Sequence, residues 1–123
     1  MTSRSRVFVV QEPLKKDHDG SVVPRFTMDG LARYGDVIMV LAWADMRPPI
    51  NELFIMRKIG ECFQQHGGLR PDDYIVPTGH PAAIAMVTMA AYDASPGPVR
   101  MLCWDAKFRK YDVITLDLEN LNR

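Results

Sequence analysis

The chain has 123 residues, of which 47% are hydrophobic and 24% are charged, and its 15 basic and 15 acidic residues give a formal net charge of zero. This length and composition predict a single globular domain over residues 1–123. Proteins that bind nucleic acid mainly through its phosphates usually carry a clear basic excess, so general nucleic-acid binding is not favoured. No apolar run approaches the roughly 18 residues that span a bilayer, so we expect no membrane contact.

Cysteine content and the start of the chain bear on the cellular compartment. Cys62 and Cys103 are the two cysteines, which is too few for the disulfide framework of a small secreted domain. The first residues carry charge but lack the apolar stretch of a secretory signal. We therefore expect a cytoplasmic protein with reduced cysteines.

Short apolar runs alternate with helix-like segments along the chain. The strands that we expect lie at residues 6–11, 36–42, 74–76, 99–105 and 111–118, and the helices at residues 27–35, 52–66 and 82–92. Thr27 and Gly35 are the expected N-cap and C-terminal stop of the first helix, and Asn51 is the expected N-cap of the second. The third helix is apolar on nearly every side, which predicts that it is buried.

The order of these elements predicts the fold class. Strands that alternate with helices form mostly parallel sheets, so we expect a small Rossmann-like α/β domain. The expected architecture is a three-layer sandwich of order β-α-β-α-β-α-β-β, with helices on both faces of the sheet and a C-terminal antiparallel hairpin. Residues 14–26 are polar and punctuated by glycine, so they are predicted to form an exposed loop.

The turn between the third strand and the third helix is the first candidate site. Thr78, Gly79 and His80 lie at the carboxyl end of a strand and before a helix N-terminus, which is where α/β folds place their ligands. Free backbone N–H groups and the helix dipole favour an anion there. Pro81 removes one donor, and no glycine-rich phosphate motif accompanies the turn, so a purely structural turn stays the simpler interpretation.

The predicted C-terminal hairpin is the second candidate site, because aromatic and cationic residues are concentrated in it. The candidate partner-binding residues are Trp104, Lys107, Phe108, Arg109, Lys110 and Tyr111. Trp, Tyr and Arg are enriched in protein-binding hot spots, and aromatic and cationic residues also bind single-stranded nucleic acid. The simplest alternative is a hairpin whose aromatic residues pack inward while its lysines stay hydrated.

Catalytic and metal-binding patterns are absent from the sequence. No nucleophile elbow is present, and no pair of carboxylates stands out as a general acid and base. Cys62 and His66 are four residues apart on one predicted helix, but a zinc site needs further ligands, so a core cysteine is the expectation. We therefore expect a protein without enzymatic activity, metal or cofactor.

Four sequence blocks together resemble a family of short hypothetical proteins encoded by tailed bacteriophages. The blocks are Val7–Glu12, Ala32–Asp36, Asp73–Pro81 and Met101–Asp105, the last followed by Tyr111. The resemblance covers most of the chain and is weakest at residues 14–26 and 51–68. His80 departs from the acidic or amide residue expected after the glycine. The resemblance implies an accessory protein inside an infected bacterium, and it brings no catalytic residue.

Three functions are consistent with these patterns. The leading hypothesis is a non-enzymatic phage accessory protein that binds a host or phage protein, with a homo-oligomer as a further option through the exposed last strand. The first alternative is a domain that binds a nucleotide or phosphate ligand with the turn at residues 78–81. The second alternative is single-stranded nucleic-acid binding through the hairpin at residues 104–111.

Overall fold

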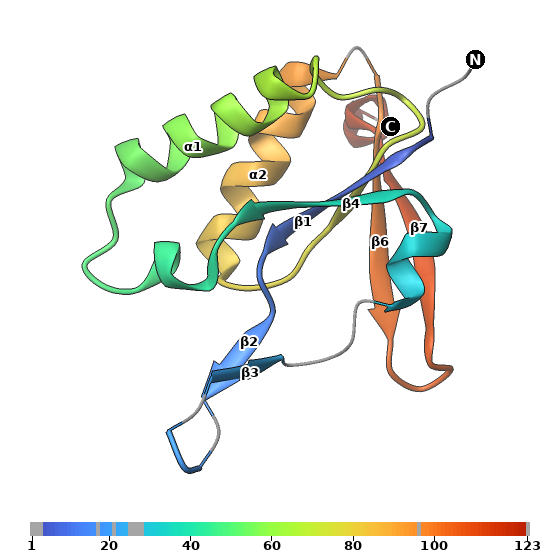
Figure 1. Cartoon of the computed structure of the whole chain (residues 1–123). Coiled ribbons are helices and arrows are strands. Elements are labelled where there is room, and N and C mark those ends of the chain that lie inside the picture. Colours follow the sequence, from blue (N-terminus) through green and yellow to red (C-terminus); the bar gives the residue numbers. More distant parts are fainter. Residues whose placement is uncertain (1–3, 17, 21, 25–28, 96, 123) are drawn as a thin grey trace.

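The computed structural model describes residues 4–16, 18–20, 22–24, 29–95 and 97–122. Its main sheet has five strands in the order β4-β1-β5-β6-β7. The strand bounds are Arg6–Gln11 for β1, Asp36–Leu41 for β4, Tyr74–Val76 for β5, Val99–Asp105 for β6 and Lys110–Leu116 for β7. β1 pairs in parallel with β4 and β5, β5 pairs in parallel with β6, and β7 pairs antiparallel with β6. The predicted mostly parallel sheet with a C-terminal hairpin is therefore confirmed (Figure 1).

The two α-helices pack against the same face of this sheet. α1 spans Glu52–Gln65 and α2 spans Pro81–Ala94, and Asn51 caps α1 as predicted, because its side chain accepts a hydrogen bond from the Phe54 amide (3.1 Å). The buried residues of both helices share one core cluster with β-strand residues of that face: Ile55, Ile59, Phe63, Ala83, Val87 and Ala91 contact the side of the sheet that presents Phe8, Val10 and Ile75. The prediction that α2 is buried all round is wrong, because its outer side is uncovered and Met89 is 67% exposed.

The opposite face of the sheet carries the 3₁₀ helix η1 (Asp29–Arg33). Leu31 of η1 is fully buried in a second core cluster with residues of β1, β5 and β6: Val7, Val9, Val76 and Leu102. Right-handed crossovers explain this division. The connections through α1 and α2 both lead toward β7, whereas the connection from β1 to β4 leads the other way. The predicted three-layer sandwich with α-helices on both faces is not confirmed.

Two segments differ locally from the sequence prediction. The expected loop at residues 14–26 contains the strands β2 (Leu14–Lys16) and β3 (Val22–Pro24), which pair antiparallel and project from the sheet as an arm (Figure 1). Each strand is only three residues long, which is too short for a sequence period to be visible. The first expected helix is the short η1, and its proposed N-cap, Thr27, lies outside the described residues.

Among the described residues, two further 3₁₀ helices are present, η2 (Trp43–Met46) and η3 (Leu118–Asn122).

Gly35 acts differently from the helix stop that we expected. A Cβ at this position would lie 2.1 Å from the Ser5 carbonyl oxygen, so only glycine lets the chain start β4 beside the start of β1. No helix within the described ranges has the length and apolar character needed to cross a membrane.

A buried ion pair joins the amino ends of β1 and β5. The side chain of Asp73 is fully buried and accepts hydrogen bonds from the Arg6 amide (2.9 Å), the Arg6 guanidinium (2.6 Å from Nη2) and the Arg70 amide (2.7 Å). Arg6 also donates to the carbonyl oxygens of His66 and Gly68 beyond the end of α1. Burial acts to raise the pKa of the Asp73 carboxyl, but the hydrogen bonds and charge of Arg6 and the Arg70 amide outweigh it and lower that pKa below its usual value.

We predict that Asp73→Asn lowers the free energy of unfolding at pH 7 by about 3–5 kcal/mol, because it leaves the Arg6 charge buried without its partner. The pKa of Asp73 is lower in the folded than in the unfolded state, so its stabilisation is present above the unfolded pKa, about 3.9. This contribution is lost as the pH falls through the folded pKa. Urea unfolding at pH 7 and below pH 4 should therefore show the gap between wild type and variant closing in acid.

Asp36→Asn is the matched control, because Asp36 pairs with Arg4 at 3.2 Å but both side chains are exposed. We expect this control to change the free energy of unfolding by less than about 1 kcal/mol. Equal effects of the two substitutions, or a gap that stays constant with pH, would contradict the assigned role of Asp73.

Candidate functional site

A cleft of about 810 Å³ lies at the carboxyl ends of β1, β4, β5 and β6. Its walls come from the base of the β2–β3 arm, η2, the turn before α2 and the β6–β7 hairpin. The lining residues are Gln11, Glu12, Pro13, Leu14, Trp43, Met46, Arg47, Val76, Pro77, Thr78, Gly79, His80, Leu102, Cys103, Trp104 and Tyr111. This volume lies within the range of about 300–1,000 Å³ that is typical of small-molecule sites.

The position of the cleft follows from the strand order. β1 is flanked by β4, the next strand of the main sheet along the chain, and by β5, the strand after that. The chain therefore reverses its direction across the sheet at β1, and connections that lead away on opposite faces leave a crevice at the carboxyl ends of the strands. Ligands of open α/β sheets bind in such crevices.

Gln11, the last residue of β1, holds two walls of the cleft together. Its side chain is 5% exposed; Oε1 accepts a hydrogen bond from the His80 amide (2.7 Å), and Nε2 donates to the Trp43 carbonyl oxygen (3.0 Å). The Gln11 carbonyl oxygen also accepts from the Thr78 hydroxyl (2.8 Å). One buried residue thus fixes the segment after β4 and the segment after β5 on either side of β1.

The predicted site at Thr78, Gly79 and His80 lines this cleft, but several of its donors are already used within the protein. The Thr78 hydroxyl and the His80 amide bond to Gln11, and the Ala82 amide donates to Nδ1 of His80 (3.0 Å), which caps α2. The turn is therefore mainly a wall of the cleft, and the backbone donors that the sequence suggested for an anion are largely occupied.

Aromatic and charged side chains form the other walls. The guanidinium carbon of Arg47 lies 4.7 Å from the centre of the Trp43 ring, a cation–π contact that positions a positive charge at the rim. Glu12 supplies a carboxylate, whose Oε1 lies 3.5 Å from the Trp43 amide. On the hairpin wall of the cleft, Trp104 and Tyr111 contact each other, with ring centroids 5.0 Å apart. The cleft thus offers flat apolar surfaces and one charge of each sign.

The hairpin residues predicted as a second site are divided among the cleft, the turn of the hairpin and a second cavity, which Arg109 and Lys110 line. Trp104 and Tyr111 line the cleft, so the structure brings them together with the turn at residues 78–80. Lys107 and Phe108 lie in the turn of the hairpin, where Asp105 Oδ1 accepts hydrogen bonds from both of their amides. Lys107 and Lys110 both approach the ring of Phe108, which is 65% exposed.

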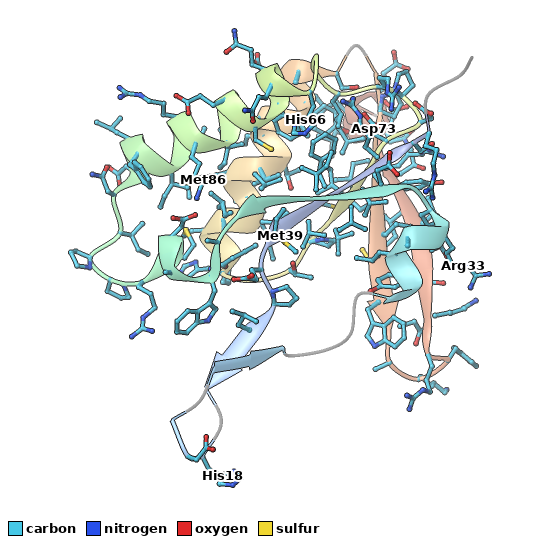
Figure 2. All side chains as sticks on the ribbon, viewed as in Figure 1. His18, Arg33, Met39, His66, Asp73 and Met86 are labelled. Atoms are coloured by element: carbon cyan, nitrogen blue, oxygen red, sulfur yellow. The ribbon has the colours of Figure 1, made fainter. Side chains whose placement is uncertain are left out.

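A second cavity, of about 560 Å³, lies between η1 and the hairpin. It is lined by Gly30, Arg33, Tyr34, Trp104, Ala106, Arg109, Lys110 and Tyr111. Trp104 and Tyr111 line both this cavity and the cleft, so the two spaces share one aromatic wall. Figure 2 shows Arg33 on η1 at this side of the sheet, far from His18 at the tip of the β2–β3 arm.

The titratable groups give no support to nucleophilic chemistry in the cleft. Burial, and to a lesser extent the charge of Asp112, raise the pKa of the Cys103 thiol, so at neutral pH it stays protonated and a weak nucleophile. Cys62 and His66 interact through a hydrogen bond and not as two ligands of one metal ion. Nδ1 of His66 bonds to the backbone carbonyl oxygen of Cys62 (2.7 Å). Within the described part of the chain, no three His, Cys, Asp or Glu side chains are grouped as a metal site would need.

Sequence reasoning missed Gln11, Trp43 and Arg47. A weak signal for Gln11 existed, because an uncharged polar residue ends a run of four apolar residues at the carboxyl end of a strand. Trp43 and Arg47 lie between the strand predicted at residues 36–42 and the helix predicted at residues 52–66, and only the pairing of β4 with β1 places that segment beside the cleft. Arg33 and Tyr34 of the second cavity were likewise not singled out.

We predict that Gly79→Ala destabilises the protein more than Gly67→Ala. Both glycines have positive φ, +99° and +76°, so both substitutions should carry a backbone cost of about 1–2 kcal/mol. A Cβ at Gly79 would also lie 2.2 Å from Gln11 Oε1, whereas a Cβ at Gly67 meets nothing within 4 Å. Displacing the Gln11 amide should add roughly 2 kcal/mol, because buried partners lose their hydrogen bonds. Chemical unfolding of both variants measures the difference, and equal losses would contradict the role given to Gln11.

Comparison with known proteins identifies the family of the chain. A model of the phage Pam3 gp32-like protein family matches residues 5–118. No curated protein matches the chain, and no solved structure does. The matched segment spans the whole five-stranded sheet and both α-helices, and so includes the residues of the cleft. The chain therefore belongs to the phage Pam3 gp32-like protein family, which confirms the resemblance of its sequence to short phage-encoded proteins.

Proposed function

We propose that this phage protein is an accessory protein of the infected bacterial cytoplasm that binds a nucleotide in the strand-end cleft. The observation that carries the proposal is the meeting of two separate sequence features, the turn at residues 78–80 and the aromatic hairpin, around one crevice at the point where the strand order reverses. The proposed activity is binding without catalysis.

The walls of the cleft suit the parts of a nucleotide. Trp43 and Trp104 offer flat faces on which a base can stack. Arg47 provides a cation for a phosphate group, since the hydrogen-bond donors of the turn at residues 78–80 are mostly engaged. The carboxylate of Glu12 can accept hydrogen bonds from ribose hydroxyls. In this arrangement the phosphate of the nucleotide lies on the Arg47 side of the cleft, and not at the N-terminus of α2.

Intrinsic fluorescence provides a direct test, because the two tryptophans of the chain both line the cleft. Titration with nucleoside monophosphates, triphosphates and cyclic nucleotides should change the emission saturably for at least one of them. A ligand at 100 times its Kd should also raise the free energy of unfolding by about 2.7 kcal/mol. Arg47→Ala should weaken a nucleotide by about ten-fold or more through the lost charged contact, and should leave binding of the uncharged nucleoside unchanged.

Arg57→Ala is the matched control, because Arg57 is an exposed cation on α1 and is absent from the cleft lining. Trp43→Phe and Trp104→Phe each leave one reporter and show which face the base contacts. If no nucleotide at millimolar concentration changes either the fluorescence or the melting temperature, the proposal is wrong.

Protein–protein binding is the second candidate function, and the exposed hairpin tip favours it. Phe108 is 65% exposed, with Lys107 and Lys110 near its ring, and aromatic residues, phenylalanine included, are enriched in protein–protein interfaces. A phage or host protein that co-purifies from infected cells should be lost with Phe108→Ala and retained with Leu53→Ala, an exposed apolar control on α1. Retention by both variants would remove the tip from consideration.

A further inference from the structure

The cavity between η1 and the hairpin has a charge unlike that of the whole chain. The full sequence has a formal net charge of zero, whereas the described residues that line this cavity include three cations, Arg33, Arg109 and Lys110, and no carboxylate. Lys110 approaches Asp112 at 3.6 Å, but both side chains are about half exposed or more, so this ion pair is weak. The cavity is a local positive site on a neutral protein.

A row of aromatic rings lies along the same face of the sheet. Trp104 contacts Tyr111 (5.0 Å between ring centroids), Tyr111 contacts Tyr34 (6.1 Å), and Tyr34 contacts Tyr74 (5.7 Å). Trp104 is the outer member of the row and is 49% exposed. The inner rings support it, so an exposed stacking surface stands directly beside the three cations. Aromatic faces next to cations are the combination that binds single strands, because every base can stack and every nucleotide carries a phosphate.

Arg109 occupies a backbone conformation that glycine would adopt more easily. Its φ is +53°, and it is the one residue other than glycine with positive φ in the described ranges. The tip of a hairpin normally accommodates this conformation with glycine or asparagine. An arginine there places a cation at the cavity against the local backbone preference, as is found where binding and local stability compete.

We propose that this cavity binds the phosphodiester backbone of single-stranded nucleic acid, with a base stacked on Trp104. Arg33, Arg109 and Lys110 contact phosphates, and the shared wall of Trp104 and Tyr111 leads the strand toward the cleft. The proposal does not depend on a nucleotide in the cleft, since Arg47 and the turn at residues 78–80 are absent from the lining of this second cavity.

The test is fluorescence anisotropy with a fluorescein-labelled oligothymidylate of about eight nucleotides, within the site sizes common for single strands. Three phosphate contacts predict a slope of about −2 for log K against log salt concentration, or a roughly twenty-fold loss of affinity between 50 and 200 mM salt. Arg33→Ala and Arg109→Gly should each reduce the magnitude of that slope by about 0.7. Trp104→Ala should weaken binding roughly ten-fold at constant slope.

Arg109→Gly keeps the test free of folding artefacts, because glycine suits the positive φ and the melting temperature should stay equal or rise. Arg57→Ala is the cation control, because Arg57 is exposed on α1 and lines neither cavity, and it should leave the affinity and the slope unchanged. The proposal is overturned by absence of binding at 20 mM salt, by equal weakening with Arg57→Ala, or by competition from thymidine monophosphate as strong as that from the unlabelled strand.

Discussion

The buried amide of Gln11 is the interaction on which the candidate site depends. A side-chain amide inside a protein must have its donor and acceptor satisfied, and an unpaired one costs about 1–3 kcal/mol. Gln11 meets this requirement by bonding to the chain after β5 through the His80 amide and to the chain after β4 through the Trp43 carbonyl. The buried Gln11 side chain also requires glycine at position 79, because the Cβ of any larger residue would occupy the space of that side chain. The two walls after β4 and β5 are therefore fixed relative to β1 before any ligand arrives.

The order of the strands determines which face of the sheet is covered by the α-helices and which face stays more exposed. The connections through α1 and α2 lead in the same direction across the sheet, so right-handed crossovers place both helices on one face and bury it. The other face has only η1 among the described elements, and there Leu31 closes a small second core. The aromatic row and the cations of the second cavity lie on this less covered face. A neutral chain thereby acquires a positive site without a basic overall composition.

Much of the fold could be predicted from the sequence, because its main elements have strong local signals. Asn51 precedes a regular apolar stripe, and Pro81 occupies the first position of α2, where its missing amide hydrogen is not needed. The β2–β3 arm could not be predicted, because two strands of three residues have no detectable period. The outer side of α2 was misjudged because Ala82, Ala85 and Met89 are apolar but exposed, which depends on packing and not on residue type.

Only some residues of the candidate site could be predicted from the sequence. His80 and Trp104 were each identified, but as members of competing sites, since nothing local shows that β5 and β6 are neighbours. Gln11 and Trp43 acquire their roles through contacts more than thirty residues apart in the chain. Residue types indicated which segments carry candidate binding side chains. The long-range pairing of the strands determined which of these side chains line the same cleft.

Hydrogen exchange of the His80 amide, measured by NMR in the wild type and in Gln11→Met, shows whether the Gln11 side chain holds the cleft together. Methionine retains the size of the side chain but removes both hydrogen bonds of the amide group. We expect the protection of the His80 amide to fall by at least about ten-fold, which corresponds to roughly 1.4 kcal/mol, while the Val9 amide in the middle of β1 stays protected. Unchanged protection of His80, or an equal loss at Val9, would show that Gln11 does not specifically hold the cleft together.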